Sequence, residues 1–136
     1  MIVRQNGGSR APAGGWSRVD LSSRTAQLCI AGTQAEVERR LADARTLFDH
    51  AWHASTDDYE ASMAAHYVAH LEPDPTAALE WELEALRRAR LDPRTDEFLP
   101  SLYVSLGGTY ERVGDTQRAR EFFDLAAALG VVHQPE

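Results

Sequence analysis

Four of the five histidines in this chain come in two close pairs, and they are the side chains most suited to metal chemistry. His66 and His70 lie four residues apart, and His50 and His53 lie three apart. Histidines at such spacings share a helix face and can ligate zinc through their ring nitrogens. His50 and His53 lie beside a predicted loop, whereas His66 and His70 lie roughly 10–20 Å from that loop along the next helix. The sequence therefore favours structural roles, with His66 as a hydrogen-bonded packing residue, over one metal site.

The cysteine and the paired carboxylates also fit structural roles better than catalytic ones. Cys29 is the only cysteine, so it forms no internal disulfide and no nearby histidine activates it; we expect a small buried hydrophobe. Asp57, Asp58 and Asp74 precede helical patterns and are expected to cap helices. All 14 basic residues are arginine, which excludes mechanisms that need lysine. We predict that the chain is not an enzyme and holds no metal or cofactor.

The composition is that of one small, acidic, packed domain. The chain has 136 residues, 43% of them hydrophobic and 26% charged, with a net charge of −7. An acidic surface repels a phosphate backbone, so nucleic acid is not an expected partner. No apolar run approaches the roughly 18–20 residues of a membrane helix, and the first 15 residues lack the apolar core of a signal peptide. We therefore expect a cytoplasmic protein with no membrane partner, which also suits a lone cysteine.

Helical patterns separated by short polar breaks fill the chain from about Arg24 to Gly130. The breaks lie at residues 55–58, 72–75, 91–93 and 114–115. We predict six helices of roughly 14–16 residues, and no segment alternates as a strand does. The predicted organisation is a flexible glycine-rich tail at 1–21, a helical domain at 22–132 and a short tail at 133–136.

Similar residues recur at two spacings within the helical part. Ala44 and Ala78 are 34 residues apart, whereas Ala78 and Ala119 are 41 apart. The second period therefore carries seven extra residues, which fit most naturally at 92–99. The same register aligns Gly32 with His66 and Gly107, Ala35 with Ala69 and Tyr110, Leu47 with Trp81 and Phe122, and Ala51 with Ala85 and Ala126.

The third unit carries a recognisable motif most fully. Its members are Tyr103, Leu106, Gly107, Tyr110, Gly114, Ala119, Phe123 and Ala126. This pattern resembles the tetratricopeptide repeat, and the chain is similar to stand-alone tetratricopeptide proteins of bacteria. The resemblance is weaker in the second unit, where His66 replaces a small residue, Glu82 an aromatic one and Pro73 the turn glycine. It implies an all-α fold of three antiparallel helical hairpins, six helices in all, stacked in a right-handed solenoid.

The resemblance also implies a concave groove lined by the first helix of each hairpin. The register places there Thr33, Glu36, Glu60, Met63, Tyr67, His70, Val104 and Glu111. Such a surface, acidic with an apolar middle, predicts an adaptor that binds another protein through a basic or neutral peptide or helix. The alternative is that Glu36, Glu60 and Glu111 are ordinary solvated positions of helices.

Two further classes of function stay open at this point. The last helix ends in an apolar stretch from Leu125 to Val132, in which Val131 and Val132 either fold back as a cap or form a homodimer interface. The second reading makes the protein a homo-oligomeric scaffold. A small-ligand or metal-binding helical protein is the third candidate. The sequence also leaves open whether residues 1–21 cover the groove.

Overall fold

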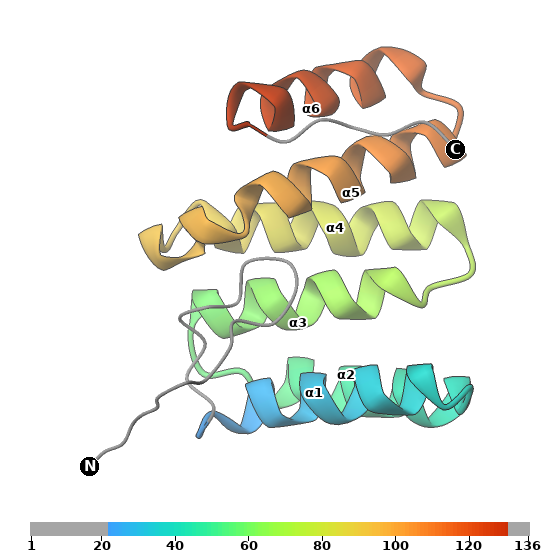
Figure 1. Ribbon diagram of the computed structural model, residues 1–136, viewed down its shortest axis with the longest axis vertical. Helices are drawn as coiled ribbons and strands as arrows, with labels where there is room; N and C mark the ends of the chain where they lie inside the picture. Colours follow the sequence, from blue (N-terminus) through green and yellow to red (C-terminus); the bar gives the residue numbers. More distant parts are fainter. Residues whose placement is uncertain (1–21, 131–136) are drawn as a thin grey trace.

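The computed structural model describes residues 22–130, and the regular structure of that range is entirely helical (Figure 1). The elements are α1 (Arg24–Val37), α2 (Leu41–Ala54), α3 (Asp58–His70), α4 (Pro75–Ala89), the 3₁₀ helix η1 (Pro93–Glu97), α5 (Leu99–Arg112) and α6 (Thr116–Ala128). The predicted all-α class and the six helices are confirmed. No helix in this range is long and apolar enough to cross a membrane. The predicted tails at 1–21 and 133–136, and Val131 and Val132, lie outside the described residues.

Short polar side chains begin the helices at the predicted breaks. An oxygen of the side chain accepts a hydrogen bond from a backbone N–H of the first turn at four helix starts, namely Ser23, Asp57, Asp74 and Asp115. Such caps satisfy donors that have no partner inside the helix. Gly114 and Gly130 follow α5 and α6 with φ angles of 88° and 93°, a left-handed conformation that glycine adopts without strain. The sequence thus encodes the helix ends locally.

Consecutive helices pack as three hairpins, α1/α2, α3/α4 and α5/α6, and the hairpins stack on one another (Figure 1). Helix α2 packs on α3, and α4 packs on α5. One buried cluster contains Leu28 of α1, Ala51 of α2, Tyr59 of α3, Leu86 of α4 and Leu106 of α5. A single hairpin could not cover its own apolar face, so this shared core explains why the three units form one domain.

The seven extra residues of the longer period form the connection that contains η1. Thr95 is fully buried, and its hydroxyl donates to the carbonyl of Ala89 at 2.7 Å. The Phe98 ring is buried as well and stacks on Tyr59 with 5.9 Å between the ring centroids. The insertion is therefore a packed element between α4 and α5, at the place the spacing predicted.

Two glycines hold the closest approaches between the helices of a hairpin. A Cβ atom added at Gly32 would lie 2.4 Å from Cε1 of Phe48, and one at Gly107 would lie 2.4 Å from Cε1 of Phe123. The Phe48 ring is fully buried, so it has little room to move away. Each aromatic ring therefore packs directly on the backbone of the opposite helix of its own hairpin.

Replacing Gly32 with alanine is expected to lower the free energy of unfolding by about 1–3 kcal/mol, because the new methyl group overlaps the Phe48 ring. The matched control is Gly108→Ala, since a Cβ there meets nothing within 4 Å. That control should gain roughly 0.5–1 kcal/mol, as alanine replaces glycine inside a helix. Urea unfolding of both variants checks this. Equal effects at the two positions would contradict the packing argument.

Candidate interaction surface

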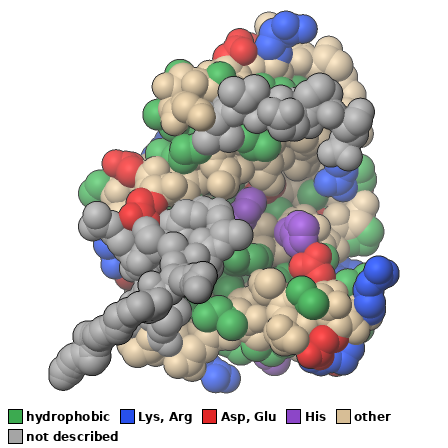
Figure 2. Space-filling model, in the orientation of Figure 1, with side chains coloured by type: hydrophobic (Ala, Val, Ile, Leu, Met, Phe, Trp, Pro, Cys, Tyr) green, Lys and Arg blue, Asp and Glu red, His purple; other side chains and the backbone are tan. Residues whose placement is uncertain are grey.

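The first helices of the three hairpins, α1, α3 and α5, form one side of the molecule, which we name the α1/α3/α5 face. Figure 2 views this side and shows histidine side chains near its middle, with an acidic side chain beside one of them. His70 Nε2 lies 2.8 Å from Glu36 Oε2, which joins α3 to α1. These residues are 34 positions apart, one repeat period, so equivalent positions of successive hairpins are neighbours here.

Glu111 is the equivalent position of the third hairpin in the repeat register. It lies 41 residues after His70, the longer period, and is exposed near the end of α5. Its carboxylate makes no hydrogen bond or ion pair with another residue of the 22–130 range. The row Glu36, His70 and Glu111 therefore presents one carboxylate paired with histidine and one that is available to a ligand.

Three more predicted residues flank this row. The Thr33 hydroxyl is exposed and donates to the carbonyl of Cys29 in its own helix at 2.9 Å. Tyr67 is half-buried and stacks on Phe48, with 5.0 Å between the ring centroids. Val104 on α5 is half-buried too. The polar row thus borders partly exposed aromatic and aliphatic groups.

The prediction that Met63 lines the surface is wrong. Met63 is 3% exposed and belongs to the hydrophobic core. The reason is its helix: α3 is packed by α1, α2, α4 and η1, so this position on α3 is enclosed. The equivalent Cys29 is also buried, as predicted, and burial, helped by the charge of Glu60, raises the pKa of its thiol to about 12. That thiol stays protonated at neutral pH and is a poor nucleophile.

Glu60 is held at the starts of α1 and α3 by local hydrogen bonds. Its carboxylate accepts from the Ser23 hydroxyl at 2.7 Å and from the backbone N–H of Thr56 at 2.9 Å. Its own backbone N–H donates to Asp57 at 2.8 Å. This arrangement is close to a capping box, whose pattern of a capping residue followed three positions later by glutamate is readable from sequence. Glu60 is therefore a structural link between two hairpins and not a free acid.

A buried carboxylate lies behind the α1/α3/α5 face. Glu82 of α4 is 2% exposed. One of its oxygens lies 2.9 Å from His66 Nδ1, and the other accepts a hydrogen bond from the Ser105 hydroxyl. We name His66, Glu82 and Ser105 the polar trio. The prediction of a hydrogen-bonded His66 is confirmed, but its partner was not foreseen.

The polar trio occupies the place where the first hairpin packs glycine on phenylalanine. His66 lies one period after Gly32, and Glu82 lies one period after Phe48. The middle hairpin thus replaces a backbone–ring contact with a hydrogen bond between two side chains. Ser105 comes from α5, so the trio also joins the second hairpin to the third. In the second unit, His66 replaces the small residue of the repeat and Glu82 replaces the aromatic one. These two replacements in one unit were the signal that could have revealed the pair.

The trio does not have the arrangement of a nucleophilic centre. The Ser105 hydroxyl donates to the carboxylate and not to the imidazole, so the serine–histidine contact that activates a nucleophile is missing from it. Burial opposes protonation of His66 and is the largest influence, but the charge of Glu82 and the hydrogen bond to it together raise the pKa of His66. The imidazolium is thereby a counter-charge for the buried carboxylate.

The two predicted histidine pairs are not brought together in a metal site. Within residues 22–130, no group of three or more His, Cys, Asp or Glu side chains is placed to hold a metal ion. His53 on α2 instead lies near Asp49, with Nδ1 3.0 Å from its carbonyl oxygen. His70 contacts the carboxylate of Glu36, and His66 contacts the carboxylate of Glu82. The polar contacts of these three histidines are thus to acidic residues.

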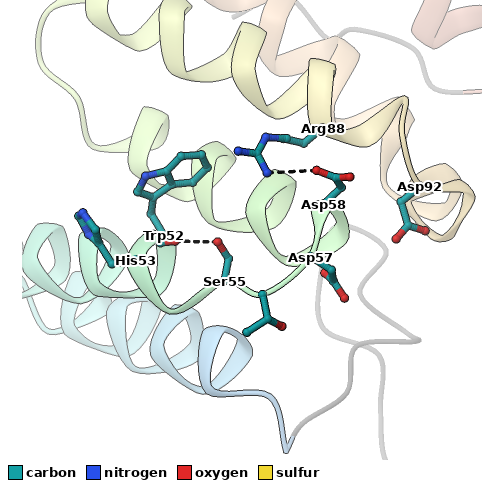
Figure 3. Close-up of a pocket in the computed structure, with 8 residues that line it drawn as sticks. Trp52, His53, Ser55, Asp57, Asp58, Arg88 and Asp92 are labelled. Atoms are coloured by element: carbon teal, nitrogen blue, oxygen red, sulfur yellow. Dashed lines mark hydrogen bonds and ion pairs between the residues drawn. The ribbon is translucent and has the colours of Figure 1, made fainter.

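An open polar pocket of about 620 Å³ lies where the α2–α3 turn meets the end of α4 (Figure 3). Its charged groups are already paired. Arg88 binds Asp58 at 3.1 Å, and Arg94 reaches both Asp57 at 3.0 Å and Asp92 at 2.6 Å. The Arg88–Asp58 pair joins α4 to α3, and the Arg94–Asp57 pair joins η1 to the start of α3. The charged residues of this pocket therefore have a structural role, because they hold neighbouring elements together.

Protein stability should fall as the pH rises through the folded-state pKa of His66. That pKa is raised, so the folded state binds the proton more tightly than the unfolded state does. The stabilisation is complete below the unfolded value of about 6.5 and is lost above the folded value. Urea unfolding across this range checks the slope. His70→Gln should keep it and Glu82→Gln should abolish it; the same slope in all three proteins would contradict the assignment.

The glycine–phenylalanine packing of the first hairpin should be tolerated in the second hairpin only when all of the required substitutions are made together. Either His66→Gly or Glu82→Phe alone breaks a buried pair and should cost about 3–5 kcal/mol. The combined variant with Ser105→Ala places glycine against phenylalanine and removes the orphaned hydroxyl. It should recover to within about 1 kcal/mol of the parent or exceed it. Thermal and urea unfolding test this, and simple additivity of the single losses would count against it.

Comparison with models of protein families, with curated proteins and with solved structures finds no match to this chain. Its function is therefore argued from its own repeat and its own surfaces.

Proposed function

We propose that this protein is an interaction module of the tetratricopeptide type, which binds a segment of another protein on the α1/α3/α5 face. The supporting observation is the 2.8 Å contact between Glu36 and His70, two equivalent positions of successive hairpins. Equivalent positions on one face of successive hairpins offer a series of contacts to an extended or helical segment. Because the helices are already formed and packed, binding orders little of the scaffold, which lowers its entropic cost.

The family part of this proposal is supported by the repeat of one packing solution. Gly32 with Phe48 and Gly107 with Phe123 show the same ring-on-backbone contact in the first and third hairpins. Periods of 34 and 41 residues relate the units. A right-handed stack of three such hairpins is the arrangement that the family resemblance implies. A bacterial, cytoplasmic setting belongs to the same proposal and suits the single buried thiol.

The proposed partner segment is basic or neutral. Glu36 and Glu111 place carboxylates on the α1/α3/α5 face, and Glu111 has no partner among the described residues. The half-buried rings and methyl groups of Tyr67 and Val104 lie along the same helices and suit the aliphatic stem of an arginine or lysine. Complementary charge would raise the association rate and exclude acidic competitors.

Self-association is a second candidate, favoured by one observation. Leu125 and Leu129 on α6 are 43% and 54% exposed. Two leucines four residues apart form an apolar stripe at α6, the last helix of the described range. A homo-oligomeric scaffold would use this stripe and would leave the α1/α3/α5 face free.

Charge reversal at Glu111 should weaken capture of a partner from the host lysate. Glu111→Arg is suitable because the residue is exposed and structurally unengaged, unlike Glu60. The matched control is Glu80→Arg, which makes the same charge change at an exposed site on α4. A specific partner should bind the control as it binds the parent, and bind Glu111→Arg at least about fivefold more weakly. Titration calorimetry with the identified segment checks the ratio.

The outcomes of this experiment separate the two candidates. Equal loss or equal retention in both variants would remove the α1/α3/α5 face as the binding site. Capture of further copies of this chain alone, in all variants, would support self-association through α6.

A further inference from the structure

The described chain begins at the N-terminal ends of α1 and α3, whereas Glu36, His70 and Glu111 lie near the C-terminal ends of α1, α3 and α5. Ser23 caps α1, and its hydroxyl donates to Glu60 on α3 at 2.7 Å. This hydrogen bond joins the starts of α1 and α3 close to the point where residues 1–21 are connected to the described chain. Anything attached to Ser22 starts its path beside α1 and α3.

The segment outside the described range is long enough to reach all three hairpins. Twenty-one residues span at most about 70 Å when extended, and a flexible coil of that length averages roughly 25 Å from end to end. Packed helices are about 8–10 Å apart, so the distance from α1 to α5 lies within this reach. Tethering also gives the segment an effective concentration in the millimolar range, which a free ligand does not have.

The charge of the segment is opposite to that of the rest of the molecule. Residues 1–21 carry three arginines, Arg4, Arg10 and Arg18, against the single acid Asp20. The whole chain nevertheless has a net charge of −7, so the acidic excess lies in residues 22–136. The α1/α3/α5 face contributes to that excess through the exposed Glu111 and the half-buried Glu36.

We propose that residues 1–21 are an internal ligand of the α1/α3/α5 face and occupy the site that a partner segment must enter. This inference rests on the proposed function for the identity of the site, and it adds an occupant and a form of regulation. Basic side chains of the segment pair with the face, as those of a partner would. With an effective concentration near 1 mM and an intrinsic dissociation constant near 0.1 mM, the segment reduces the affinity for a competitor roughly tenfold.

Paramagnetic labelling of the full chain tests the contact. A spin label on Ser9→Cys reacts selectively, because Cys29 is buried and protonated at neutral pH. Amide signals of Tyr67 and Glu111 should broaden, whereas that of Glu80 on α4 should not, and dilution should leave the pattern unchanged. Replacing Arg4, Arg10 and Arg18 with glutamine should remove the broadening. Broadening that vanishes on dilution, or that survives the glutamine substitutions, would overturn the proposal.

A synthetic peptide of residues 1–21 tests the competition in trans. It should bind the full-length triple-glutamine variant about tenfold more tightly than the parent chain, because the parent's face is already occupied. Adding Glu111→Arg to that variant should weaken the peptide again. Equal binding to parent and variant would exclude internal occupancy. If an unrelated partner still depends on Glu111 in that case, the proposed function stands without this inference.

Discussion

The direct packing of an aromatic ring on the backbone of the opposite helix is the contact on which the rest of the structure depends. Phe48 on Gly32 and Phe123 on Gly107 leave no space for even a methyl group. Such contacts fix the distance and rotation between the helices of a hairpin, because a packed interior cannot shift without opening voids. Stacking then brings equivalent residues of the first two hairpins, Glu36 and His70, into contact on the α1/α3/α5 face.

The middle hairpin meets the same constraint with charges instead of a ring, and this ties it to one neighbour. A buried carboxylate is costly unless its counter-charge and hydrogen bonds are in place. Within the hairpin, His66 supplies the counter-charge, but the second oxygen of Glu82 is satisfied only by Ser105 of α5. The third hairpin therefore completes the polar trio of the second. An apolar surface can pack against many different neighbours, whereas the second oxygen of Glu82 needs a hydrogen-bond donor in one position.

The parts of the structure that sequence reasoning predicted are those encoded by local spacing. Helix breaks and caps follow from residues a few positions apart, and the insertion that became η1 follows from residues one period apart. The misplaced or unforeseen features depend on how neighbours enclose a residue. Met63 has a surface register but lies on the helix that is packed on most sides. The link between His66 and Glu82 crosses two helices, and it was visible only as two departures from the repeat that had to be considered together.

Net charge is a poor guide to what the face can bind, because most of its acids are already used. Of the carboxylates on or behind it, Glu82 is neutralised inside the trio and Glu60 caps a helix. Glu36 Oε2 lies 2.8 Å from His70 Nε2. Of these four carboxylates, Glu111 alone has no hydrogen bond or ion pair with another residue of the 22–130 range. Recognition of a basic segment would therefore depend on one free carboxylate and on a second that is shared with His70, beside aromatic and aliphatic groups. This small number makes the surface selective for where a partner places its charges and not for how many it carries.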